Sequence, residues 1–270
     1  MIMMIRQVAC FLVVSLMAFT AHADGAQTAA RQSEKGRTTV VFAVSWLPGF
    51  CVTRPERAEC KAQKPGSFDA THFTLHGLWP VGKSYCGVDA TVKAQDRKRK
   101  WLDLPRPELE ADARVTLASA MPGVQSGLDR HQWVRSGRCH SPTADAYFKT
   151  QMQYLNVLNG SAVRGLFVER LGGHVKEQEV RQVFDRVFGS GAGDRVRLQR
   201  RKVGETTVVT GLTIGLGGGT SNLPAKAVSD VGVRASEGDG DYSDLSALIL
   251  AADAIDGKCP TGLIRSVDAR

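Results

Sequence analysis

The body of the chain lacks a long apolar run, and this absence excludes a multi-pass membrane protein. After residue 23, no stretch of about 18 or more apolar residues occurs. With 43% hydrophobic and 23% charged residues, the composition is that of a globular protein rather than a disordered chain. The 270 residues suffice for one or two domains.

Cysteines are few, and they show none of the spacings of a structural zinc site. Six occur in the chain, without a CxxC pair or a Cys/His cluster. Five of them follow residue 23, and five is an odd number. Because cysteines normally pair in an oxidising compartment, we expect at least one thiol that is free or pairs between chains.

The first 23 residues are typical of a cleaved secretory signal. Arg6 provides a positive start, residues 8–18 are apolar, and Ala21-His22-Ala23 is a small-x-small cleavage signal. The alternative is a membrane anchor, which the short apolar run and the lack of a stop-transfer pattern disfavour. We therefore expect cleavage near Ala23 and a periplasmic or secreted protein with no membrane attachment.

The remaining patterns predict one α+β domain over residues 38–270, preceded by a flexible leader over 24–37. Strand-like segments alternate with helix-like segments without regular βαβ order, so we expect a central, mostly antiparallel sheet packed by several helices. Strands are expected at 38–46, 73–78, 195–202 and 206–216, the last two forming a hairpin. Helices are expected at 107–120, 144–158, 161–171, 177–188 and 245–254, and loops at 51–70 and 93–100.

The chain is basic, with 35 Lys and Arg residues against 27 Asp and Glu residues and a net charge of +8. Arg6 is the only charged residue of the signal, so the mature chain keeps almost all of this charge. Part of it lies in the basic segment 93–100. A positive balance favours an acidic partner such as nucleic acid, an anionic glycan or a membrane surface.

Two histidines lie in surroundings that favour chemistry. His76 belongs to the segment FTLHGLWP and ends an apolar strand, and His131 begins the segment HQWVRSGRC. Each is also compatible with a buried structural histidine. A strand-end histidine beside a tryptophan, together with a second His–Arg segment, favours acid–base chemistry on an anion. A metal-dependent hydrolase is disfavoured because neither a carboxylate nor a third ligand accompanies the two histidines.

These two segments resemble the catalytic segments of the ribonuclease T2 family. FTLHGLWP is similar to the first, and HQWVRSGRC is similar to the second, which usually reads HEWxKHGTC. AVSWLPGFC at 43–51, Met121-Pro122 and LILAADAIDGKCPTGLI at 248–264 resemble further parts of the family. The resemblance covers residues 38–265 and implies a T2-type fold.

The resemblance implies an endoribonuclease that cleaves single-stranded RNA without a metal or a cofactor. In this chemistry the ribose 2′-hydroxyl attacks the adjacent phosphorus and a 2′,3′-cyclic phosphate results. DNA lacks the 2′-hydroxyl, so DNA cleavage is not expected. A monomer is expected.

The resemblance also implies roles for individual residues. His76 matches the general acid that protonates the leaving oxygen, and His131 matches the phosphate-binding histidine. Arg135 stands where a lysine is usual and keeps a permanent cation. Trp79 and Trp133 match the aromatic residues that frame the site, more by packing than by chemistry.

Two catalytic positions depart from the family pattern. Gln132 replaces a glutamate, and Ser136 replaces the general-base histidine. Losing a positioned base typically costs about 10²–10⁴ in rate. His140 and His131 are the candidate substitute bases, although Gly137 argues against the unbroken helix that would align His140 with Ser136. The alternative reading is a catalytically inactive RNA-binding relative of the same fold.

The resemblance further implies a disulfide pairing. Cys86 is expected to bridge Cys139, which leaves Cys51 and Cys60 as the local pair. Cys259 normally pairs in the family with a cysteine of the preceding strand region. Residues 195–217 contain no cysteine, so Cys259 is expected to be the free thiol.

Overall fold

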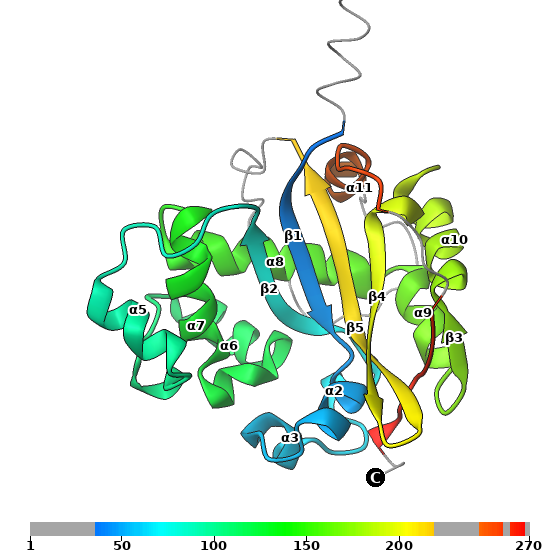
Figure 1. The fold of residues 1–270 in the computed structure, drawn as a ribbon, viewed down its shortest axis with the longest axis horizontal. Helices are drawn as coiled ribbons and strands as arrows, with labels where there is room; N and C mark the ends of the chain where they lie inside the picture. The colour runs from blue at the N-terminus through cyan, green and yellow to red at the C-terminus, as the bar shows by residue number, and fades with distance from the viewer. Residues whose placement is uncertain (1–35, 219–242, 256–259, 268–270) are drawn as a thin grey trace, which may run out of the picture. The chain divides into compact units, whose positions relative to one another are not determined.

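A mixed sheet forms the centre of the described part of the chain, which comprises residues 36–218, 243–255 and 260–267 of the computed structural model (Figure 1). Its strands follow the order β2-β1-β5-β6-β3, and β4 pairs with β5. The strands are β1 (Thr38–Ser45), β2 (Thr74–Pro80), β3 (His174–Lys176), β4 (Val196–Val203), β5 (Thr206–Gly217) and β6 (Thr261–Leu263). The strand pairs are antiparallel except β5 with β6. The expected α+β class with a mostly antiparallel sheet is confirmed.

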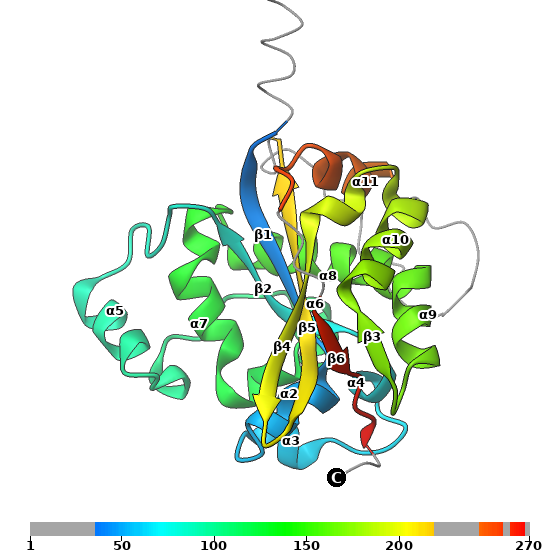
Figure 2. The same cartoon turned by 45° about the vertical axis from the view of Figure 1, so that its right-hand side comes forward.

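Helices cover the sheet and extend beyond its two edges. The α-helices are α2 (Leu47–Thr53), α3 (Ala58–Ala62), α4 (Phe68–Thr71), α5 (Ala90–Arg97), α6 (Ala111–Ala120), α7 (Leu128–Arg135), α8 (Ala144–Asn159), α9 (Ala162–Glu169), α10 (Glu177–Phe188) and α11 (Ser243–Leu250). Short 3₁₀ turns are η1 (Trp101–Asp103), η2 (Pro122–Ser126), η3 (Gly137–Cys139) and η4 (Ala192–Arg195). In both ribbon views α5 and α7 lie beyond β2, whereas α10 and α11 lie on the opposite side (Figures 1 and 2).

The hydrophobic core lies between the sheet and α8. Phe42 on β1 and Ile214 on β5 are fully buried and belong to the same cluster as Phe148 and Leu155 on α8. Along β1, residues 40–45 are buried except Val41, so the end of this strand is covered on both faces. Because these contacts fix the central strands, β2 presents a rigid edge toward α7.

The strand hairpin and the later helices are where the sequence predicts them. The alternating residues of 195–216 form β4 and β5, and the helical patterns of 144–158, 161–171 and 177–188 form α8, α9 and α10. The helix expected at 107–120 begins later, at Ala111. Residues 1–23, most of the leader 24–37 and Cys259 lie outside the described residues, so the signal, the leader and the free thiol stay predictions. Within the described ranges no helix combines the length and apolarity needed to cross a bilayer.

The prediction of two loops is wrong. Residues 51–70 contain the last three residues of α2, the whole of α3 and the first three residues of α4, helices that have seven, five and four residues. Helices this short show no clear periodicity and depend on tertiary contacts. Residues 93–100 belong mostly to α5, whose Asp96 is only 2% exposed. Because Lys and Arg dominate this segment, its composition suggested an exposed loop, although the carboxylate of Asp96 faces the protein interior.

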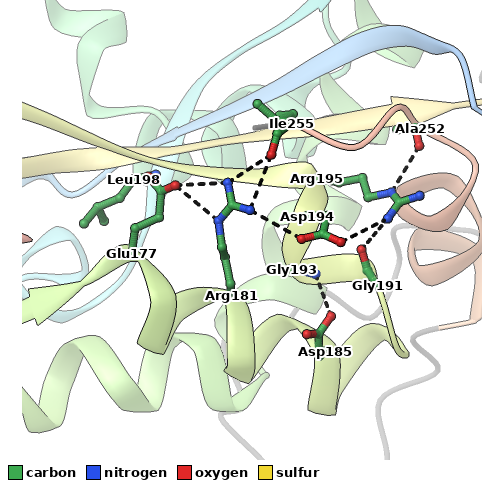
Figure 3. A network of polar contacts seen from close by, with 10 residues as sticks. All are labelled: Glu177, Arg181, Asp185, Gly191, Gly193, Asp194, Arg195, Leu198, Ala252 and Ile255. Atoms are coloured by element: carbon green, nitrogen blue, oxygen red, sulfur yellow. Dashed lines mark hydrogen bonds and ion pairs between the residues drawn. The ribbon is translucent and has the colours of Figure 1, made fainter. Parts of the chain in front are cut away.

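A polar network binds the segment after α11 to α10 and β4 (Figure 3). The Arg181 guanidinium lies 3.0 Å from Glu177 Oε1 and donates to the carbonyl oxygen of Ile255 at 3.4 Å. Glu177, which is buried, also accepts a hydrogen bond from the backbone N–H of Leu198 at 3.0 Å. Arg195 donates from Nε to the carbonyl of Ala252 at 3.1 Å. These bonds join three segments that are distant in sequence.

We predict that Arg181→Met lowers the free energy of unfolding by about 2–3 kcal/mol, because it leaves the buried Glu177 carboxylate without its cation. Urea denaturation measures the change. Arg186→Met on the same helix is the control, since Arg186 is exposed and has no ion pair among the described residues. Equal stabilities of the two variants would contradict a stabilising role of the network.

Candidate active site

His76 enters the site from a β-bulge in β2. The pairing of β1 with β2 shifts register after Ala43, which pairs with Gly77, whereas Val44 pairs with Leu75. His76 is thus the extra residue, and bulges of this kind redirect a side chain. Its Nδ1 lies 3.1 Å from the hydroxyl oxygen of Ser45.

Gly77 permits a close crossing beside His76. A Cβ at this position would lie 2.3 Å from Oε1 of Gln132 and 2.4 Å from Nε1 of Trp79. These two atoms form a hydrogen bond of 2.9 Å, which Trp79 donates and Gln132 accepts. Any larger residue would push β2 away from α7. The close packing of these two elements therefore requires the glycine of the HGLWP motif.

His131 lies on α7 and is held by contacts on two sides. Its Nδ1 lies 2.5 Å from Oδ1 of Asp96 on α5, and its ring stacks on Trp101 with centroids 4.3 Å apart. The second carboxylate oxygen of Asp96 accepts a hydrogen bond from the Tyr85 hydroxyl at 2.7 Å. The His131 ring is therefore fixed both in its plane and in its rotation.

Two cavities meet at His76, His131 and Arg135. The first, of about 440 Å³, is also lined by Trp101 and Tyr85, and the second, of about 430 Å³, by Trp79. The lining arginines of the first cavity are Arg54, Arg57, Arg97, Arg99 and Arg135, and Lys83 joins Arg135 in the second. An anion bound at the junction would have cations around it and an aromatic-lined cavity on either side.

The protein groups around His76 and His131 favour the neutral form of both rings. Burial, followed by the nearby charges of His131 and Arg57, lowers the pKa of His76 to about 4. Burial also lowers the pKa of His131, and the Asp96 carboxylate opposes this shift. A phosphate anion at the junction would raise both values, because it stabilises the charged form of each ring.

The two departing residues border the second cavity. Ser136 is 3% exposed and follows the last turn of α7, where the helix ends at Arg135. Gln132, which is also buried, is engaged by Trp79 as described above. Both side chains are thus near His76 and His131, as the resemblance implies.

Two further sequence candidates are not brought to this junction. His140 follows the 3₁₀ turn η3, packs against Tyr147 and lines neither of the two cavities. Trp133 also contacts Tyr147 and lines a separate groove on another face of α7. The helix break after Arg135, which Gly137 suggested, is the reason that His140 does not follow the face of α7.

Two disulfides fix loops around the site. Cys86 is bonded to Cys139, which ties the segment of Tyr85 to the end of the second motif. Cys51 is bonded to Cys60, next to Arg54 and Arg57. Among the described residues, no three or more His, Cys, Asp or Glu side chains form a group that could hold a metal ion.

The sequence analysis missed three residues of the site: Asp96, Tyr85 and Trp101. Asp96 is the only acid in the run KAQDRKRK, and Trp101 follows that run directly. A lone carboxylate inside a basic segment and an adjacent tryptophan were signals of a packed element. The sequence gave no signal that Asp96 contacts His131, since the two residues are 35 positions apart.

Comparison with known proteins finds a family match over part of the chain. The model of the ribonuclease T2 family matches residues 37–165. Ribonuclease I of Escherichia coli is 27% identical over 250 residues, which cover 82% of this chain and 90% of that protein.

Solved structures give weaker matches. A mutant of RNase MC1 in complex with 5′-UMP matches with a TM-score of 0.46 and 17% identity, over 67% of this chain and 89% of that chain. RNase NT in complex with 5′-AMP has a TM-score of 0.45 and 16% identity, over 64% and 82% of the two chains.

We predict that the His76 imidazole titrates with a midpoint near pH 4 in the free protein, and that inorganic phosphate raises the midpoint. NMR titration of the ring signals measures both. His140 is the internal control, because it lines neither cavity and its midpoint is expected to stay unchanged by phosphate. A His76 midpoint above about 6 without phosphate would contradict the buried, cation-rich environment.

Proposed function

We propose that this chain, a member of the ribonuclease T2 family to which residues 37–165 belong, is an endoribonuclease that cleaves single-stranded RNA by metal-independent transesterification. The observation that carries the proposal is the junction of two cavities at His76, His131 and Arg135. A phosphodiester has a nucleoside on each side of its phosphorus. The two cavities beside the cationic junction match this layout.

The proposed reaction is the attack of a ribose 2′-oxygen on the adjacent phosphorus. As the new O–P bond forms and the bond to the 5′-oxygen breaks, His76 gives its proton to that leaving oxygen. Arg135 stabilises the charge on the phosphate oxygens, and its guanidinium keeps its charge at every working pH. The products are a 2′,3′-cyclic phosphate and a 5′-hydroxyl.

The low pKa of His76 sets a condition on this mechanism. A general acid must be protonated when the leaving oxygen departs, and His76 with a pKa of about 4 is neutral at pH 7 in the empty site. The bound phosphate supplies the negative charge that raises this pKa. The value of kcat/KM, which reports the free enzyme, is therefore expected to decline with rising pH in the neutral range.

Ser136 supports a second candidate, an RNA-binding relative without catalysis. A buried serine stands where the family has its general base, and the cationic cavities would still bind RNA. The two candidates share a fold and a binding site. They differ only in whether the bound RNA is cleaved.

The cellular setting is proposed from the leader and the cysteines. The signal-like residues 1–23 and the two disulfides support export to an oxidising compartment, periplasmic or extracellular. The partner is single-stranded RNA, and DNA, which lacks the 2′-hydroxyl, is not cleaved. We propose that the protein acts as a monomer and that residues 38–270 belong to one ribonuclease T2-like domain.

The purified protein is expected to cleave RNA equally well with and without EDTA and to leave 2′,3′-cyclic phosphate ends. Among the described residues of the site, no three His, Cys, Asp or Glu side chains lie close enough together to hold a metal ion. End-group analysis of the fragments by mass spectrometry identifies the products. Loss of cleavage in EDTA with recovery on adding a divalent ion would overturn the proposal, and binding without cleavage would favour the non-catalytic relative.

His76→Ala removes the proposed acid in the same assay. We expect cleavage to fall at least about 100-fold, within the range that a positioned acid supplies, while RNA binding persists. His174→Ala is the matched control, since His174 is exposed on β3 at the other edge of the sheet from β2. Equal losses in both variants would mean that folding rather than chemistry is affected.

A further inference from the structure

We propose that His131 is the base that takes the 2′-hydroxyl proton, and that Asp96 is the positioning residue that holds it in this role. The inference rests on the proposed ribonuclease activity and answers the question that Ser136 raises. The structure pairs a buried carboxylate with a histidine at the junction of the two cavities. Neither motif contains this carboxylate.

The Asp96 contact selects one form of the His131 ring. A carboxylate beside Nδ1 accepts a hydrogen bond from the N–H at that nitrogen, so the neutral ring carries its hydrogen on Nδ1 and a lone pair on Nε2. Nε2 has no hydrogen-bond partner among the described residues, while the ring lines both cavities. This is the orientation that a general base needs.

Asp96 is itself fixed. Its side chain is 1% exposed, and its other oxygen accepts from the Tyr85 hydroxyl at 2.7 Å. Tyr85 has a φ of 58°, a left-handed conformation that costs free energy in a non-glycine residue and that the surrounding structure must enforce. The neighbouring disulfide from Cys86 to Cys139 and the bond from the Tyr85 N–H to the Arg135 carbonyl at 2.8 Å supply that constraint.

The charges that face His131 come from several elements. Burial disfavours the protonated ring most strongly, Asp96 on α5 favours it, and Arg135 on α7 and Arg57 before α3 add smaller unfavourable effects. His76 on β2 is the other titratable ring at the junction. Asp96 is thus the group that stabilises the imidazolium formed when the base accepts a proton. Burial, helped by the arginines, keeps the ring neutral and ready to accept a proton before the reaction.

The proton balance is complete with these two rings. The proton of the 2′-hydroxyl passes to Nε2 of His131 as the O–P bond forms. The bond from phosphorus to the 5′-oxygen breaks as His76 gives its proton to that oxygen. His131 ends protonated and His76 neutral, and exchange with water restores both.

The other candidate bases are less well placed. Ser136 has a hydroxyl with no described partner that could take its proton. His140 lines neither cavity, and its Nδ1 lies 2.8 Å from the hydroxyl oxygen of Ser141. His131 alone among these three combines access to the junction with a carboxylate behind it.

Asp96→Asn tests the inference because it keeps the size of the side chain and removes the charge. We expect kcat for a short RNA to fall at least about 100-fold with KM changed less than threefold, since a base held without its carboxylate is poorly oriented and its imidazolium is unstabilised. The acidic limb of the pH profile of kcat/KM should move to lower pH, because removing the Asp96 carboxylate lowers the pKa of His131. A merely structural carboxylate would not move this limb.

Asp69→Asn is the matched control. Asp69 on α4 is also buried and accepts a hydrogen bond from Gln63 at 2.8 Å, but it lines neither cavity. If both Asn variants behave alike while His76→Ala is inactive, the dyad is wrong and the ribonuclease proposal stands. If the parent protein does not cleave RNA, both proposals are wrong.

A measurement on the unaltered protein covers the case in which Asp96→Asn does not fold. The ¹⁵N chemical shifts of the His131 ring at neutral pH distinguish the two neutral tautomers. We expect the hydrogen on Nδ1, facing Asp96. A hydrogen on Nε2 would leave no lone pair toward the cavities and would overturn the inference.

Discussion

The hydrogen bond between Asp96 and His131 is the interaction on which the arrangement of the site depends. It joins α5 to α7, and it places a buried carboxylate in a region whose other charges are mostly arginines. Most arginines around the first cavity are exposed, so water screens their mutual repulsion, and the charge in direct contact with the His131 ring is the buried Asp96 carboxylate. With it, the site remains strongly cationic toward a ligand while one ring is held in a defined orientation.

The scaffold separates the parts that give stability from the parts that bind. The network around Arg181 and most of the core between the sheet and α8 lie away from the cavities, while the core residue Leu75 also lines the first of them. The site is instead assembled at the edge strand β2, from a bulge that redirects His76, a glycine that admits the Trp79–Gln132 contact, and a disulfide that ties Cys86 to Cys139. Substitutions at the site can therefore alter chemistry with limited effect on the core.

The sequence predicted the framework of this molecule better than the details of its site. Strong periodicity located α8, α10 and the β4–β5 hairpin, because each buries a continuous apolar face. Local motifs located His76 and His131. They could not locate Asp96, whose partner is distant in sequence, and the charge of its neighbours suggested an exposed loop. Gly137 indicated that α7 ends before His140, but no local pattern indicated that His140 then packs against Tyr147.

The central claim is that His131 accepts the proton of the 2′-hydroxyl, in place of a base at position 136, where this chain has a serine. Chemical rescue measures this most directly: His131→Gly opens space for a free imidazole beside Asp96, and cleavage of a short RNA is followed with increasing imidazole at several pH values. The account predicts a variant at least about 100-fold slower than the parent, with a rate that rises with the concentration of neutral imidazole. A folded, RNA-binding variant that imidazole does not accelerate, or one that cleaves as fast as the parent, would contradict it.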